Sequence, residues 1–206
     1  MKHEWRKLEK DIYLPKTKPE LIYIPKMKYI TIEGKGNPNE PEFSKRVSTL
    51  YSIAYTIKML PKKGFVIDDY FAYTVYPLEG LWGLTEAGLK LNYLDKKELV
   101  YTIMIRQPDF VTREVFENAL QMVRKKQFLN YLDEVSFTEM EDGLSVQMLH
   151  IGAYDDEPRS FSIMDDFLIQ NNLKRRTFFH KEIYLSDPNK VDQDKQKTVL
   201  RYMVNK

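Results

Sequence analysis

The sequence predicts an α+β fold in which a strand-helix-strand-strand unit occurs twice. Strand-like and helix-like segments follow one another in the same order at about residues 27–106 and again at about 143–206. The two helices also begin with the same letters, because Glu40 and Glu157 are each followed by proline. Two such tandem units, related by a pseudo-twofold axis, would form antiparallel sheets with a ligand cleft between the repeats.

The first repeat is predicted from the spacing of its apolar residues. The letters "MKYITIEG" (27–34) alternate like a strand, and a helix over 40–59 starts where Asn39 can cap it and Pro41 suits the first turn. Its apolar stripe consists of Phe43, Val47, Leu50, Tyr51, Ala54 and Ile57. The predicted strands that follow are "YFAYTVYP" (70–77) and "ELVYTIMIRQ" (98–107), and the loop between them holds "LEGLWGLT" (78–85).

The second repeat follows the same plan. Its predicted segments are the strand "LSVQMLHIG" (144–152), a helix over 157–171 that "AYDDEPRSF" opens, and the strands "TFFHKEIYL" (177–185) and "KTVLRYMV" (197–204). The inner stripe of this helix consists of Phe161, Met164, Phe167 and Leu168.

Two segments lie outside the repeats. An insert at about 108–142 contains a helix that Thr112 can cap, followed by a strand and turn in "EVSFTEMEDG". The first 26 residues are rich in Lys and Pro and predict an extended lead-in with little helix. We therefore predict one domain over residues 1–206.

The composition limits the class of protein. A hydrophobic content of 43% suffices for one good core, and 32 basic against 30 acidic side chains are interleaved along the chain. This balance argues against a basic nucleic-acid surface, and the lack of cysteine excludes disulfides and thiolate metal sites. Apolar runs stay short of the roughly 20 residues that span a bilayer, and polar letters follow Met1. We expect a cytoplasmic protein that contacts neither membrane nor nucleic acid, whereas the sequence leaves its oligomeric state open.

Common catalytic and metal-binding motifs do not match the chain. "GKGNP" (34–38) lacks the lysine and hydroxyl residue of a phosphate loop, and the serine of "FSIMDD" lacks a nucleophile elbow. His3, His150 and His180 lack the i, i+4 spacing of a helical zinc site, so we predict no metal and no cofactor. The remaining candidates are aromatic and acidic residues near strand ends: Tyr73, Glu79, Trp82, Tyr154, Glu182 and Tyr184.

Glu182 lies in the middle of the strand-like letters "FHKEIYLSDP" (179–188). Side chains alternate across a strand, so Glu182 shares a face with His180 and Tyr184, while Ile183 points the other way. On a solvent-exposed face of a sheet this carboxylate would need no functional explanation. In a cavity among aromatic rings it would be costly to bury, which indicates a functional role.

Several blocks together resemble a known family. The sequence is similar, in order and over nearly the whole chain, to the GyrI-like small-molecule-binding proteins, and more narrowly to a stand-alone subfamily that includes cyclopropanoid cyclopropyl hydrolases. The blocks are "IYLPKTKPELIYIPKMKYITIEGKGNPN", "LYSIAYTIK", "PLEGLW", "LHIGAYDDEP", "HKEIYLSDP" and "KTVLR". The resemblance implies the tandem fold already predicted and a ligand cleft that contains Glu182.

The resemblance also implies roles for individual residues. Trp82 and Tyr154 match positions of an aromatic cage that holds a planar ligand, and Tyr73, Glu79, His180 and Tyr184 are further ligand-binding candidates. Three positions depart from the subfamily's usual letters: Gly83 replaces a second Trp, Ala153 a Pro, and Phe179 a His. The loss of a Trp removes one wall of a cage, which weakens the case for catalysis more than the case for binding.

Catalysis of the subfamily's type would open a strained cyclopropane fused to a dienone. Trp and Tyr faces would hold the planar substrate and stabilise positive character at the attacked carbon. A desolvated Glu182 would take a proton from water. The structural alternatives are that Glu182 pairs with a lysine or arginine, that Glu79 is a loop or capping residue, and that Trp82 covers the core.

Three kinds of function compete. The first is the binding of planar, often cationic xenobiotics, either alone or as the effector-sensing partner of a transcription regulator. The second is the hydrolysis just described. The third is a haem- or tetrapyrrole-binding module of the same architecture, with His150 or His180 as the axial ligand.

Overall fold

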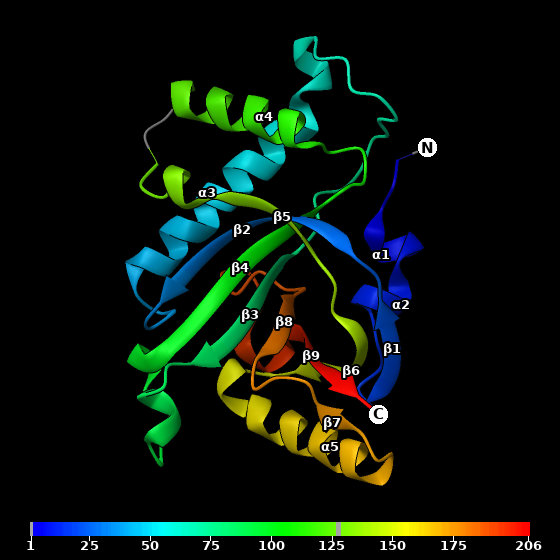
Figure 1. Cartoon of the computed structure of the whole chain (residues 1–206), viewed down its shortest axis with the longest axis vertical. Coiled ribbons are helices and arrows are strands. Elements are labelled where there is room, and N and C mark those ends of the chain that lie inside the picture. The colour runs from blue at the N-terminus through cyan, green and yellow to red at the C-terminus, as the bar shows by residue number, and fades with distance from the viewer. Residues whose placement is uncertain (1, 127–128) are drawn as a thin grey trace. The chain divides into compact units, whose positions relative to one another are not determined.

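The computed structural model describes residues 2–126 and 129–206, and within it the chain forms two compact units (Figure 1). Gln127 and Phe128 of the predicted insert lie outside the described residues. Unit 1 comprises Met1–Glu4, Met27–Leu78 and Leu84–Met140, and unit 2 comprises Trp5–Lys26, Glu79–Gly83 and Glu141–Lys206. Each unit therefore combines segments that are far apart in the sequence.

Unit 1 is an antiparallel three-stranded arrangement with two helices. The elements are β2 (Met27–Lys35), α3 (Pro41–Met59), β4 (Leu99–Gln107), α4 (Arg113–Lys126) and β5 (Ser136–Met140). The central strand β2 pairs with β4 and β5, so Ile30 lies opposite both Ile105 and Phe137. Helix α3 packs against β2, β4 and α4. As predicted, Thr112 caps α4, because its Oγ1 accepts the Val115 amide at 3.3 Å.

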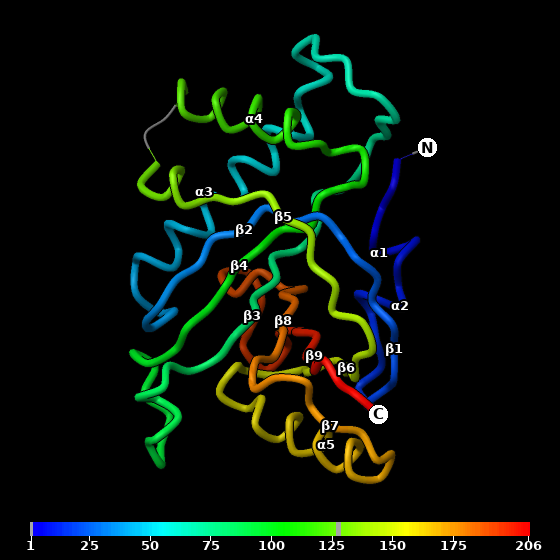
Figure 2. The backbone as a smooth tube through the Cα atoms, in the orientation of Figure 1, coloured from blue at the N-terminus to red at the C-terminus, as the bar shows by residue number. Residues whose placement is uncertain are grey.

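Unit 2 contains the longer run of antiparallel strands, in the order β1-β6-β9-β8-β3. Its elements are α1 (Trp5–Leu8), α2 (Lys10–Tyr13), β1 (Glu20–Ile24), the middle of β3 (Leu78–Leu84), β6 (Gly143–Ile151), α5 (Glu157–Gln170), β7 (Lys174–Arg175), β8 (His180–Tyr184) and β9 (Lys197–Asn205). The backbone trace in Figure 2 shows β1 running beside β6, with which it pairs.

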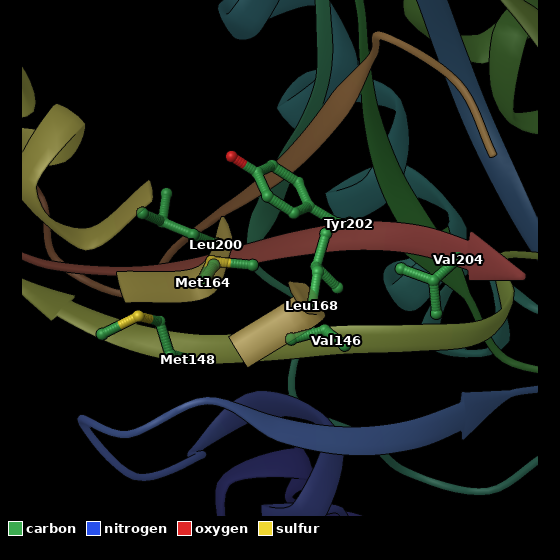
Figure 3. Packing of buried hydrophobic residues seen from close by; sticks show 7 residues of the cluster. All are labelled: Val146, Met148, Met164, Leu168, Leu200, Tyr202 and Val204. Carbon is green, nitrogen blue, oxygen red and sulfur yellow. The ribbon is translucent and has the colours of Figure 1, made fainter. Parts of the chain in front are cut away.

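One face of the unit 2 strands is covered by α5. Met164 and Leu168 of this helix are buried against residues of β6 and β9 (Figure 3). The strand side chains in this core are Val146, Met148, Leu200, Tyr202 and Val204. Burial of each large apolar side chain stabilises the fold by roughly 1.5–3 kcal/mol, so this cluster fixes α5 to the strands of unit 2.

The opposite face of the same strands carries a buried ionic network. Lys181 Nζ lies 2.7 Å from Asp142 Oδ1 and 3.6 Å from Glu79 Oε2, and Arg201 Nη1 lies 3.0 Å from Asp142 Oδ2. Arg201 Nη2 also donates to the carbonyl of Ile12 at 3.0 Å. The network therefore ties the N-terminal segment of unit 2 to the strands.

The α+β class, the antiparallel strands and the strand-helix-strand-strand order of both repeats are confirmed. The predicted helices at 40–59 and 157–171 correspond to α3 and α5, and the second repeat's strands correspond to β6, β8 and β9. The organisation as one domain, the pseudo-twofold relation and the cleft between the repeats stay predictions.

Two of the predicted segments are wrong. The strand predicted at 70–77 contains only an isolated bridge between His3 and Tyr73, and the segment predicted as a loop at 78–85 forms strand β3. Its glycines suggested a loop, but Gly80 accommodates a neighbouring ring, since a Cβ there would come within 2.5 Å of Trp82 Nε1. The lead-in also differs from the prediction, because α1, α2 and β1 lie within it.

Candidate functional site

The register of β3 and β8 gathers the candidate residues on one face. Glu182, His180 and Tyr184 alternate along β8, and Trp82 on β3 lies directly opposite His180. Gly80 lies opposite Glu182, and the Trp82 ring occupies the space above this glycine. This is the face that α5 covers, because Leu200 of the core lies opposite Glu182 on the other side of β8.

A chain of hydrogen bonds links these side chains. Trp82 Nε1 donates to the Tyr184 hydroxyl at 2.7 Å, and that hydroxyl donates to Glu182 Oε2 at 2.8 Å. His180 Nε2 donates to Glu182 Oε1 at 2.9 Å. The ring of Tyr154, from the turn before α5, meets the Tyr184 ring edge-on at 5.9 Å. With its side chain only 12% exposed, Glu182 is not an ordinary carboxylate on a wet surface.

Sequence reasoning missed Glu157, the first residue of α5. Glu157 is only 6% exposed, and its Oε1 is buried with no hydrogen-bond partner among the residues that the structure describes. A buried carboxyl group without such a partner is more stable neutral than charged. Burial, followed by the negative charge of Glu182, raises the pKa of Glu157 to about 10. The two groups therefore hold one negative charge at neutral pH.

The sequence does contain a signal for Glu157, in addition to the Glu-Pro pair that indicates the repeat. Glu157 ends the acidic run of "AYDDEP", three residues after the cage candidate Tyr154, and proline follows it at the helix start. We call Trp82, Tyr154, Glu157, His180, Glu182 and Tyr184 the Glu182 cluster.

The two tyrosines of the Glu182 cluster stay protonated at physiological pH. Burial and the nearby Glu182 charge raise the pKa of Tyr154 to about 12. The same two causes, in the same order, raise the pKa of Tyr184 well above its ordinary value. Both phenols are therefore hydrogen-bond donors beside a carboxylate, not competing anions.

Two of the predicted site residues lie elsewhere. Glu79 is on the opposite face of β3, buried beside Lys181 in the ionic network, so it is neither a loop residue nor a neighbour of Glu182. Tyr73 belongs to unit 1, where its ring packs among Phe71, Tyr76 and Phe110. Tyr73 is among the candidates because the sequence predicts a strand at 70–77. The structure has its strand at Leu78–Leu84 instead, so Tyr73 precedes β3.

The departure at Gly83 affects the other face of the strand. A Cβ at Gly83 would come within 2.6 Å of the Phe179 ring, which occupies that space. Because strand side chains alternate, position 83 points away from the face of Trp82 and Glu182. In this chain Gly83 and Phe179 fit each other, and neither is a wall of the Glu182 cluster.

His150 is engaged within unit 2. Its Nε2 lies 3.0 Å from the Ala153 carbonyl and its Nδ1 lies 2.9 Å from Ser160 Oγ. The carbonyl requires an N–H at Nε2, so Nδ1 accepts from the serine hydroxyl. Both ring nitrogens of this buried histidine are thus used to link β6 to the start of α5. Across residues 2–126 and 129–206, no group of three or more His, Asp or Glu side chains is placed to hold a metal ion.

Two surface hollows are lined by residues outside the Glu182 cluster. One of about 450 Å³ in unit 1 is lined by polar residues: Thr31, Glu33, Glu134, Ser136 and Thr138. One of about 430 Å³ in unit 2 lies between Leu21 of β1 and the end of α5. Chemistry, rather than the size of a hollow, distinguishes the Glu182 cluster, because only there do a shared carboxyl charge and several aromatic rings meet among the residues that the structure describes.

Fold and site together define an α+β protein with a small-molecule-binding domain. The chain belongs to the GyrI-like small molecule binding domain family, whose model matches residues 17–204. Among curated proteins, none matches the chain. The helices in the described part of the chain include none that is long and apolar enough to cross a membrane.

Solved structures support this assignment. A structure described as a hydrolase from Listeria innocua is 39% identical, with a TM-score of 0.91, and the match covers 100% of both chains. An uncharacterized conserved protein from Listeria innocua is also 39% identical, with a TM-score of 0.91 over 98% of this chain and 100% of that one. The C-terminal domain of EcmrR, at 16% identity and a TM-score of 0.54, covers 95% of this chain and 99% of that one and shares the fold alone.

Proposed function

We propose that the protein binds planar, positively charged small molecules at the Glu182 cluster. The observation that carries this proposal is a carboxylate that is only 12% exposed and lies among aromatic rings. Within the described residues, no lysine or arginine forms an ion pair with Glu182, and the adjacent Lys181 points to the other face, toward Asp142. This disfavours the alternative in which Glu182 is one half of a structural ion pair.

A cationic aromatic ligand would satisfy both features of this site. The carboxylate charge is poorly hydrated, so its attraction for a cation is stronger than that of an exposed acid. Trp82, Tyr154 and Tyr184 come from three separate segments and offer stacking and cation-π contacts. Neutral planar molecules would gain the stacking alone.

Glu182→Gln is expected to weaken a cationic dye much more than a neutral dye of the same shape. We suggest 10-methylacridinium and 10-methylacridone as the matched pair, titrated calorimetrically. Loss of one partly desolvated charge contact corresponds to about 1.5–3 kcal/mol, or roughly tenfold or more in affinity. Equal losses for the two dyes would contradict the proposed charge recognition.

Two further variants control this experiment. Trp82→Ala should weaken both dyes, because stacking area does not depend on ligand charge. Glu139→Gln removes an exposed strand carboxylate from β5 of unit 1 and should leave both affinities unchanged.

Hydrolysis of cyclopropane-bearing alkylating compounds is a second candidate function, favoured by the 39% identity to a protein described as a hydrolase. In this proposal Glu182 accepts a proton from a water molecule whose oxygen attacks the ring CH2. The broken C–C bond leaves its electron pair on the dienone, which becomes a phenolate and takes a proton from solvent. Incubation with a spirocyclopropyl dienone should yield a product one water heavier, and Glu182→Gln should abolish the catalysed part. A rate equal to that without protein would refute hydrolysis while leaving ligand binding intact.

A further inference from the structure

Glu157 has a position that the proposed binding function does not yet use. It is the buried first residue of α5, the helix that covers the face of β8 on which Glu182 lies, and the Glu182 charge acts on its carboxyl group. The charged and titratable groups around this pair are Glu182 and Asp155, which act on Glu157 directly, and His180, Tyr184 and Tyr154, which contact or face Glu182. None of these groups is a lysine or arginine that could compensate a second buried carboxylate charge.

The hydrogen-bonding pattern shows where the proton lies. Both oxygens of Glu182 already accept hydrogen bonds, from His180 and from Tyr184, so Glu182 is the carboxylate of the pair. Glu157 Oε1 is buried and has no hydrogen-bond partner among the residues that the structure describes. A buried carboxyl group in that situation is more stable neutral than charged. Glu157 is therefore the neutral member.

We propose that a cationic ligand displaces the proton of Glu157, so that Glu157 becomes a second ligand-binding carboxylate and cation binding is coupled to proton release. This inference rests on the proposed function. In the exchange the O–H bond of Glu157 breaks and the proton passes to the buffer, which leaves two carboxylates facing one positive charge. The site would thus select planar cations. The affinity of the protein for such a cation would increase with pH.

The size of the coupling follows from electrostatics. A unit positive charge about 4 Å from a carboxyl group, at an effective dielectric constant of about 20, weakens proton binding by about a thousandfold. Such a change moves the pKa of Glu157 from about 10 toward neutrality. Between these two values the affinity for a cation should rise by up to about tenfold per pH unit, whereas the affinity for a neutral ligand should not change.

The test is calorimetric titration of the full chain with 10-methylacridinium and 10-methylacridone at pH 7, 8 and 9. Each titration is repeated in two buffers of different ionisation enthalpy, which gives the number of protons released. The wild-type protein should release a proton with the cation alone, with affinity rising about tenfold or more from pH 7 to pH 9. Glu157→Gln should bind both dyes without proton release and without pH dependence.

Glu40→Gln is the matched control, because Glu40 also precedes a proline at a helix start but is exposed in unit 1. It should behave like the wild type. Cation binding by the wild type without proton release would overturn the inference and leave the proposed function intact. Because this measurement needs only the wild-type protein, it tests the inference even if Glu157→Gln does not fold. Equal proton release in wild type and Glu157→Gln would also overturn it. No binding of the cation by the wild type would overturn both.

Discussion

Lys181→Met is expected to destabilise the protein by about 3–5 kcal/mol, the usual result of removing one partner from a buried ion pair. The Lys181 side chain is fully buried, and its ammonium group lies between Asp142 and Glu79, which are nearly as buried. Methionine fills similar volume but leaves the Glu79 carboxylate without this cation. Arg201 still pairs with Asp142, whereas Glu79 loses the lysine that lies 3.6 Å from its Oε2.

Urea denaturation followed by tryptophan fluorescence measures this effect. The control is Lys190→Met, which removes an exposed lysine paired with Asp187 at 2.8 Å and should cost less than about 1 kcal/mol. Adding Glu79→Gln to Lys181→Met should restore part of the lost stability, because it removes the buried carboxylate charge that faced this lysine. A loss for Lys181→Met as small as that of the control would show that the network contributes little to the folded state.

Glu157→Gln is expected to stabilise the protein increasingly as the pH rises from about 5 to 9. The pKa of Glu157 is raised from 4.5 to about 10 on folding, so in this range the folded protein binds a proton that the unfolded chain has lost. The stability from this group is thus complete below pH 4.5 and decreases by up to about 1.4 kcal/mol per pH unit as the pH rises toward 10. Glutamine resembles the protonated carboxyl group but has no proton to lose, so it avoids this decrease.

Thermal unfolding of both proteins at several pH values tests the prediction. The melting temperature of Glu157→Gln should exceed that of the wild type by a margin that widens with pH, at roughly 2–4 °C for each kcal/mol. The exposed Glu40→Gln variant should differ little from the wild type at any pH. A constant or narrowing margin for Glu157→Gln would mean that Glu157 is ionised in the folded protein.

Local patterns were sufficient for the second repeat. The apolar stripe of α5 and the alternation of β8 and β9 are properties of consecutive residues, and the structure confirms them. The same patterns failed at β3, where Gly80 and Gly83 suggested a loop. Gly80 leaves room for the ring of Trp82, and Gly83 leaves room for the ring of Phe179, which is distant in the sequence.

The sequence by itself determined the order of the elements in the second repeat and the residues of β8 that share a face with Glu182, because hydrophobic periodicity and strand alternation act between near neighbours in the chain. The tertiary structure alone decided that α5 covers this face, that Glu79 lies in the network on the other face, and that Glu157 meets Glu182. These features depend on desolvation and on charges brought together from distant segments. The raised pKa of Glu157 is the clearest case, since its causes are burial and, after that, the charge of a strand carboxylate 25 residues further along the chain.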